Sequence, residues 1–155
     1  AIANRLHEWV HTVMLAHDER ALVDVLLSDL QSRFLIPQAA VRIWGTPERP
    51  LLTSLTDLSC ALAVSDDVKS FTASLSVPYC GVNAGFEASG WLENCNQVAS
   101  LAMIPLRVQG QTYGMLVLGS PDPTRYTADM GVEFLQQLGD LASAALARLL
   151  LLTEI

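Results

Sequence analysis

The sequence predicts an α+β fold in which helices from both ends of the chain cover one face of a central antiparallel sheet of five to six strands, while short helices and loops cover the other face. Apolar residues recur at helical spacing at both ends, and two apolar strand patterns joined by a tight turn occupy the last third. An irregular, breaker-rich segment separates these regions. The length of 155 residues without a linker-like stretch predicts one domain over residues 1–155.

Two helices are expected at the start of the chain. The first shows apolar residues three and four positions apart, at Leu6, Val10, Val13 and Met14. We interpret residues 1–17 as a helix that continues from a segment preceding Ala1. Asp18 is expected to cap the second helix, since its carboxylate can accept a hydrogen bond from the first turn. That helix should end before Pro37, because proline pushes the preceding residue out of the helical region.

Strand patterns begin after the second helix. Residues 41–44 read as one strand and residues 51–55 as a weaker one, so that the turn at residues 45–50 predicts a hairpin. Residues 66–75 fit a short helix capped by Ser65. The segment that follows is rich in breakers and small residues, and an irregular lid is expected there.

The clearest strand pair is formed by residues 98–108 and 111–118, whose tight turn contains Gly110. Both strands are apolar at nearly every position. An antiparallel sheet with one wet face would alternate between apolar and polar residues. We therefore expect both faces of this sheet to be covered.

A long helix is expected to close the chain after a rigid loop at residues 119–126. Thr127 is the expected cap, and Asp129 suits the positive end of the helix dipole. The predicted buried stripe is Met130, Phe134, Leu138, Leu141, Ala145, Leu149 and Leu152. From position 141 onward the helix is apolar around most of its circumference, which predicts a homodimer through the terminal helices.

Composition and charge exclude several kinds of partner. Sixteen acids against nine scattered bases give a net charge of −7, which argues against a nucleic acid or an anionic membrane surface as partner. No apolar run approaches the length of about 20 residues that a membrane span needs. An odd set of three cysteines, Cys60, Cys80 and Cys95, favours reduced thiols over a disulfide framework, and we expect a cytoplasmic location.

One pattern of residues and spacings runs through the last third of the chain: Ser100, Ile104, Pro105, Leu106, Gly110, Leu116, Gly119, Ser120, Asp122, Arg125, Tyr126, Met130, Gly131, Phe134 and Leu135. Together with the opening Asn4–Arg5–Leu6 and with Pro78, Cys80 and Gly81, it resembles an uncharacterised bacterial GAF-like family, the domain of unknown function 484. The resemblance covers essentially the whole chain and implies a GAF/PAS-like fold, but no established activity. Tyr126 stands where the family usually has phenylalanine.

A GAF-like fold implies a ligand pocket between the sheet and the irregular middle segment. Tyr79, Phe86 and Trp91 lie in that segment, and Arg42 and Trp44 share one face of the first strand. The complete set of candidate ligand-binding residues is Arg42, Trp44, Tyr79, Cys80, Phe86, Trp91 and Ser100. The alternative is that the aromatic residues pack on the sheet as a lid without a ligand.

One branch of the GAF superfamily reduces free methionine sulfoxide with thiolates that line its pocket. Cys80 and Cys95 lie in the segment that would roof such a pocket. That branch takes an acid from the strand in which this chain has Val117 and Gly119. The missing acid disfavours this reductase, and no catalytic residue is assigned.

Neither a metal nor an organic cofactor is expected. His7 and His11 lie one helical turn apart, but a third ligand is missing, so we assign no metal site. No histidine follows His17 to accompany a covalent bilin, and the cyclic-nucleotide motif of phosphodiesterases is not recognisable.

The loop residues Ser120, Asp122 and Arg125 are interpreted as structural, with Asp122 and Arg125 locking the loop against the final helix. The leading hypothesis is a non-enzymatic GAF-like regulatory or sensory module that binds a small molecule, forms a dimer, or does both. A thiol-dependent reductase and a purely structural interaction domain with a filled pocket are the alternatives.

Overall fold

The computed structural model describes residues 2–126 and 132–152, except for the side chains of residues 2 and 3. In chain order its α-helices, 3-10 helices (η) and strands are α1 (Ile2–Leu15), α2 (Glu19–Phe34), β1 (Gln38–Ile43), η1 (Thr53–Leu55), η2 (Ser59–Ala61), α3 (Asp66–Ser74), β2 (Tyr79–Val82), η3 (Glu87–Trp91), η4 (Cys95–Gln97), β3 (Ser100–Val108), β4 (Gln111–Ser120) and α4 (Glu133–Leu150). No helix in the described part of the chain is both long and apolar enough to cross a membrane.

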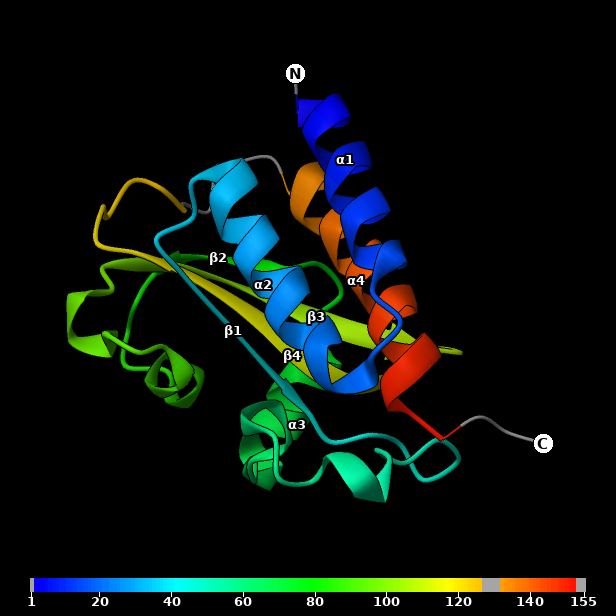
Figure 1. The fold of residues 1–155 in the computed structure, drawn as a ribbon. Coiled ribbons are helices and arrows are strands. Elements are labelled where there is room, and N and C mark those ends of the chain that lie inside the picture. The colour runs from blue at the N-terminus through cyan, green and yellow to red at the C-terminus, as the bar shows by residue number, and fades with distance from the viewer. Residues whose placement is uncertain (1, 127–131, 153–155) are drawn as a thin grey trace.

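The described strands form one antiparallel sheet in the order β1-β4-β3-β2. Figure 1 shows α1, α2 and α4 on one side of this sheet and α3 with the 3-10 helices η3 and η4 on the other. We call these sides the helix face and the lid face. The α+β class and the placement of the helices agree with the prediction, but the predicted sheet of five to six strands is wrong, since four strands are present in the described residues.

The predicted strand at residues 51–55 is not formed. Leu51 makes only an isolated bridge to Leu151, and the next residues turn into η1. The backbone here bonds to the end of the chain instead of to β1: Leu52 donates to the carbonyl of Leu150, and Leu152 donates to that of Pro50. The prediction of a hairpin was therefore wrong, because contacts distant in sequence took the hydrogen-bonding groups that a second strand would have used.

Strand β2 lies in the segment where the sequence predicted irregular structure. It pairs with β3 in the register Cys80↔Ala102 and forms an edge of the sheet. Four residues that include Gly81 are too few to show a strand pattern, so the pairing with β3 is what makes this segment a strand.

The hairpin between β3 and β4 confirms the prediction. Its turn residues Gln109 and Gly110 have φ angles of 53° and 78°, the left-handed conformation that a tight hairpin turn requires. The two strands are buried at nearly every position, and their side chains alternate between two apolar clusters. The sheet is thus covered on both faces, as expected.

Two predicted helix caps are confirmed. The carboxylate of Asp18 accepts a hydrogen bond of 3.0 Å from the backbone N–H of Arg20, and the Ser65 hydroxyl accepts one of 3.2 Å from that of Val68. Helix α2 ends at Phe34, before Pro37, as predicted.

The final helix agrees with its predicted stripe only in part. Leu138 and Ala145 are buried, and Phe134, Leu141 and Leu149 are half-buried. Leu152 was wrongly included, because the helix ends at Leu150 and Leu152 is 50% exposed. The predicted cap and first-turn residues Thr127 and Asp129, and Met130 in the stripe, lie outside the described residues.

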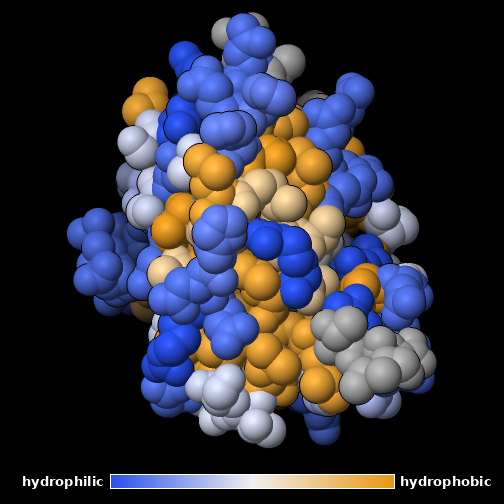
Figure 2. Space-filling view, turned by 45° about the vertical axis from the view of Figure 1, so that its right-hand side comes forward, coloured by the Kyte–Doolittle hydropathy of each residue, from blue (hydrophilic) through white to orange (hydrophobic). Residues whose placement is uncertain are grey.

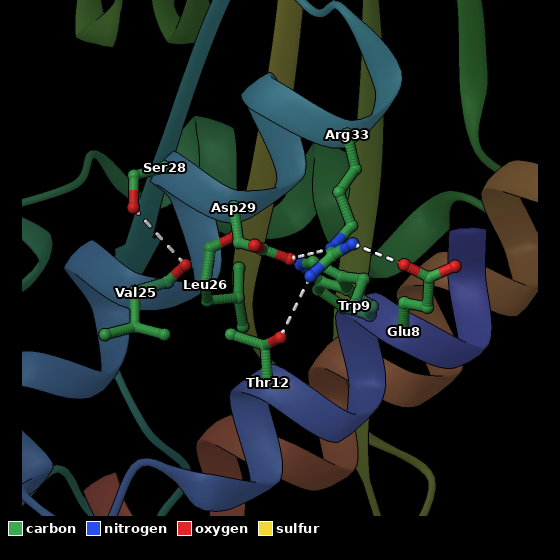
Figure 3. Close-up of polar contacts among 8 residues, drawn as sticks. All are labelled: Glu8, Trp9, Thr12, Val25, Leu26, Ser28, Asp29 and Arg33. Carbon is green, nitrogen blue, oxygen red and sulfur yellow. Dashed lines mark hydrogen bonds and ion pairs between the residues drawn. The ribbon is translucent and has the colours of Figure 1, made fainter.

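Polar contacts join α1 to α2 on the helix face. The indole N–H of the buried Trp9 donates to the carbonyl of Leu26 at 3.1 Å. Figure 3 shows the guanidinium of Arg33 between side chains of both helices, where it bonds to Asp29 at 2.6 Å, Glu8 at 2.8 Å and Thr12 at 3.2 Å. These bonds fix α1 in register on α2.

Candidate functional site

Five of the seven candidate ligand-binding residues lie on the lid face, where side chains from β1 and from the segment between β2 and η3 converge. The guanidinium of Arg42 lies 5.1 Å from the ring centroid of Trp91, a cation–π distance. Phe86 packs edge-on against Tyr79 at 5.1 Å between ring centroids, and Trp44 packs against the same lid-face cluster. The structure therefore brings these five residues to one side of the sheet.

The other two candidates, Cys80 and Ser100, lie on the helix face. Both Cys80 and its paired residue Ala102 belong to the apolar cluster of that face. The Ser100 hydroxyl donates to the carbonyl of Asp122 at 2.7 Å and accepts from the backbone N–H of Tyr126 at 3.2 Å. Ser100 thus anchors the loop that follows β4, on the face opposite to Arg42 and Trp91.

The lid face of the sheet is closely packed. Met103, Met115 and Val117 project from the central strands and are fully buried. The hydroxyl of Thr72 in α3 donates to the sulfur of Met115 at 3.5 Å, which places the lid helix directly on the sheet. A Cβ atom added to Gly119 would lie 2.6 Å from Leu92 Cδ1, so a lid side chain fills the space next to this position.

A mixed polar and apolar groove runs along the outer edge of β1, with a cavity volume of about 210 Å³. Its lining residues are Val23, Asp24, Leu27, Ala39, Ala40, Val41, Arg42, Ser59, Cys60, Trp91 and Glu93. Burial lowers the pKa of Arg42, because desolvation disfavours its charged form, and the nearby Cys60 opposes this shift. The guanidinium remains a cation at neutral pH, since arginine does not deprotonate in proteins.

Hydrogen bonds to the end of α2 and within the loop hold the segment that follows β4. Arg125 donates to the carbonyls of Phe34 at 3.0 Å and Leu35 at 3.1 Å, which are free at the C-terminal end of α2. The prediction placed this anchor on the final helix, whereas the observed one is on α2. Ser120 accepts a bond from the backbone N–H of Asp122 at 3.1 Å.

The Asp122 carboxylate organises the same loop. It accepts hydrogen bonds from the backbone N–H of Thr124 at 2.8 Å and from its hydroxyl at 2.7 Å. The bond from the Thr124 backbone and then that from its hydroxyl hold the pKa of Asp122 below its ordinary value, because they favour the charged form.

The three thiols differ in their burial. Cys60 and Cys80 are buried, and desolvation raises the pKa of both, which disfavours the nucleophilic thiolate. Cys95 is half-buried in η4. Among the described residues, no group of three or more His, Cys, Asp and Glu side chains is arranged to hold a metal ion, and His7 and His11 are exposed on α1.

A second candidate surface lies between α1 and α4, outside the residues assigned from the sequence. Two adjoining hollows of about 290 and 300 Å³ share Val10 and Leu141. Their combined lining is Leu6, His7, Trp9, Val10, Val13, Met14, Gln137, Leu141, Ala144, Ala145 and Arg148. Figure 2 shows apolar side chains gathered on this side of the molecule, with hydrophilic side chains around them and across their middle. The all-round apolar character of the last helix was the sequence signal for it.

Comparisons with known proteins agree on family and fold. A family model described as "Protein of unknown function, DUF484" matches residues 1–150. No curated protein matches the sequence. Solved structures that resemble the chain include the GAF domain of a phosphoenolpyruvate-protein phosphotransferase from Acinetobacter, with 15% identity, a TM-score of 0.66 and coverage of 94% of this chain and 92% of that one.

Two further structures share the fold. The GAF domain of a putative sensor histidine kinase from Pseudomonas syringae pv. tomato has 17% identity and a TM-score of 0.56, and the match covers 95% of this chain and 86% of that one. The free methionine-R-sulfoxide reductase from Neisseria meningitidis, in complex with its substrate, has 13% identity and a TM-score of 0.59, with coverage of 94% and 87%. At such identities the similarity shows a GAF fold and does not extend to activity.

Proposed function

Because this chain belongs to the DUF484 family and has a GAF fold, we propose that it is a non-enzymatic regulatory module that works as a homodimer through α1 and α4. The observation that carries this proposal is the apolar surface between these two helices. The GAF domains of a phosphotransferase and of a putative sensor kinase supply the precedent for a regulatory role.

Exposed apolar area on α1 and α4 favours a partner, because removing such area from water stabilises an assembly by about 25 cal/mol per Å². Met14 is 46% exposed beside the half-buried Val10 and Leu141. Methionine adapts its shape to an apolar partner. A second copy of the chain can pair these surfaces about a twofold axis, since the same patch then meets itself.

Analytical ultracentrifugation tests the dimer. We expect a dimer at micromolar concentration, and we expect Leu141→Glu to give a folded monomer, because the interface would bury an unpaired carboxylate. Leu62→Glu is the matched control, since Leu62 is 54% exposed away from α1 and α4. A monomeric wild type at tens of micromolar, or equal effects of the two variants, would contradict the proposal.

Small-molecule binding is the second part of the proposal, and it rests on the aromatic group of the lid face. Phe86 stacks on Phe71 at 5.9 Å between ring centroids and meets Tyr79 edge-on at 5.1 Å, and such rings suit a planar apolar ligand. Native mass spectrometry would detect a retained metabolite. Thermal-shift screening would detect a ligand that prefers the folded state, because such a ligand raises the melting temperature.

The reductase alternative has less support, although reductases of free methionine sulfoxide are among the structural neighbours. A buried Cys80 on the helix face and the Val117 and Gly119 positions of β4 disfavour the thiolate and the acid that this chemistry needs. Incubation with methionine sulfoxide and a dithiol should give no turnover. Turnover that depends on Cys80 or Cys95 would overturn the assignment as a non-enzyme.

A further inference from the structure

The groove beside β1 is short and is bordered by η2. This 3-10 helix packs along β1 and contributes Ser59 and Cys60 to the lining. The volume of about 210 Å³ lies between the engineered cavity of about 150 Å³ that binds benzene and the roughly 300 to 1,000 Å³ of pockets for drug-sized ligands. The groove therefore suits a compact metabolite and leaves no room for an extended chain.

The lining of this groove carries charges of both signs. Among the described residues that line it, Arg42 is the one basic residue, while Asp24 and Glu93 contribute two carboxylates. Both acids are exposed, whereas Val41 and Cys60 are buried. The carboxylates therefore lie at the rim of the groove, above a floor formed by Val41 and Cys60.

The guanidinium of Arg42 is held in place without an oxygen acceptor. It lies 5.1 Å from the ring centroid of Trp91, and this contact orders it. Within the described parts of the chain it donates no side-chain hydrogen bond and forms no ion pair with Asp24 or Glu93. Five other arginines do donate side-chain hydrogen bonds to described residues: Arg20, Arg33, Arg49, Arg107 and Arg125. The half-buried Arg42 therefore has N–H donors available for a ligand.

A ligand for this groove must suit both signs of charge. A carboxylate matches the planar guanidinium of Arg42, because its two oxygens can accept two parallel N–H bonds. A dianion such as inorganic phosphate is disfavoured, because it would also face Asp24 and Glu93 in a chain of net charge −7. A plain cation would face Arg42. A small molecule with one carboxylate and one ammonium group meets all of these charges with an opposite one.

We propose that the groove beside β1 binds a free α-amino acid, with its carboxylate on the guanidinium of Arg42 and its ammonium group directed toward the rim carboxylates of Asp24 and Glu93. Leu27 and Ala39 are half-buried in the lining and would contact the aliphatic part of the amino acid. This inference deepens the small-molecule part of the proposed function, on which it rests, and it assigns a site distinct from the aromatic group.

Isothermal titration calorimetry of the wild-type protein with each of the common L-amino acids tests the ligand class. Each amino acid that binds is compared with its N-acetyl derivative, which lacks the ammonium charge, and with its amide, which lacks the carboxylate. We expect at least one free amino acid to bind. Either derivative should bind about ten-fold more weakly or worse, because each loses one charge-assisted contact with the groove.

Substitution of Arg42 tests the site. Arg42→Met keeps an apolar stem but removes the guanidinium, so it should weaken binding of the free amino acid by about ten-fold or more. The affinity of the amide should change little, since the amide lacks the carboxylate that Arg42 binds. Arg42→Lys should restore part of the affinity because it restores a cation. Lys69→Met on α3 is the matched control, because it removes a cation outside the groove and should leave binding unchanged.

A second variant keeps the proposal testable if Arg42→Met destabilises the fold. Asp24→Asn with Glu93→Gln changes two exposed side chains and keeps their shape. It should weaken binding of the free amino acid by about ten-fold and leave the affinity of the N-acetyl derivative unchanged, since that derivative has no ammonium charge. Asp67→Asn on α3 is the control for this variant and should leave both affinities unchanged.

Three results would overturn the proposal. The first is that no L-amino acid binds at millimolar concentration, and the second is that acetate or the N-acetyl derivatives bind as tightly as the free amino acids, which would assign the groove to simple anions. The third is binding that survives Arg42→Met but is lost in Phe86→Ala, which would place the ligand at the aromatic group. Retention of a different metabolite in native mass spectrometry, combined with the first result, would overturn this inference and leave the proposed function standing.

Discussion

Helices α1, α2 and α4 bury the helix face of the sheet largely under aliphatic side chains, whereas α3 and η3 cover the lid face with half-buried aromatic rings. The helix face contains buried polar contacts as well, such as the 2.6 Å hydrogen bond from the Tyr113 hydroxyl to the carbonyl of Ser143. On the lid face, Phe71, Phe86 and Trp91 are only half-buried.

The difference teaches that the two faces contribute unequally to the stability of the fold. Long helices with continuous apolar stripes remove more surface from water than short 3-10 turns do, so the helix face should supply most of the unfolding free energy. The lid carries fewer buried contacts and should open before the global transition.

Replacing one tryptophan on each face should give the largest difference in unfolding free energy between the two faces. Trp9→Ala should lower the free energy of unfolding by about 3–5 kcal/mol, because Trp9 is 1% exposed and its N–H bonds to Leu26. Trp91→Ala should cost less than about 2 kcal/mol, since Trp91 is half-buried on the lid. Urea denaturation measures both values. Equal losses would remove the distinction between the faces.

Two arginines donate hydrogen bonds to carbonyls at the C-terminal ends of helices, one on each face. Replacing them should change the unfolding free energy by a smaller amount. Arg107 donates to the carbonyls of Thr72, Ala73 and Leu75 at the end of the lid helix α3. Arg107→Met should cost about 1–3 kcal/mol and should speed amide exchange mainly in α3, because charged hydrogen bonds to this helix are lost.

The matched variant on the helix face is Arg125→Met, which removes the bonds to Phe34 and Leu35 at the end of α2. It should affect exchange only near that end, since the apolar stripe still holds α2 on the sheet. Hydrogen exchange followed by mass spectrometry compares the two variants. Faster exchange throughout α2 but not in α3 would show that the helix face is the weaker one.

The smallest expected difference between the faces is in the rates at which their cysteines react with a thiol reagent. Cys95 in η4 is half-buried and should react first with iodoacetamide, whereas the buried Cys60 and Cys80 should react only when the surrounding structure opens. Peptide mapping by mass spectrometry after timed labelling gives the three rates. Reaction of Cys80 as fast as that of Cys95 would mean that the helix face opens as readily as the lid.

The same burial makes stability depend on pH. Burial raises the pKa of Cys60 and Cys80 in the folded protein. Their contribution to the unfolding free energy is therefore fully present below the ordinary thiol pKa of about 8.5, and it is lost as the pH rises through the raised pKa values. As the pH is raised above about 8.5, the urea concentration at the unfolding midpoint should decrease in the wild type. It should decrease less in the double variant Cys60→Ala with Cys80→Ala. The buried Tyr113 and Tyr126 act in the same direction but at higher pH, because the ordinary phenol value is about 10.

The sequence alone was sufficient to predict those elements that depend on residues close together in the chain. The caps Asp18 and Ser65 and the left-handed turn at Gly110 were predictable, because a side chain or backbone preference near in sequence decides each of them. The burial of both sheet faces followed from the near-continuous apolar strands β3 and β4. The family resemblance and the order of the elements were likewise readable from the sequence.

Contacts distant in sequence decided the rest. Strand β2 exists because β3 pairs with it, and Leu51 bridges Leu151 across a hundred residues of chain instead of extending a hairpin with β1. The strand registers place Cys80 and Ser100 on the helix face, away from Arg42 and Trp91. A shift of one residue in register exchanges the two faces, and no local preference specifies that register. The division of the candidate residues between the two faces is therefore a property of the tertiary structure alone.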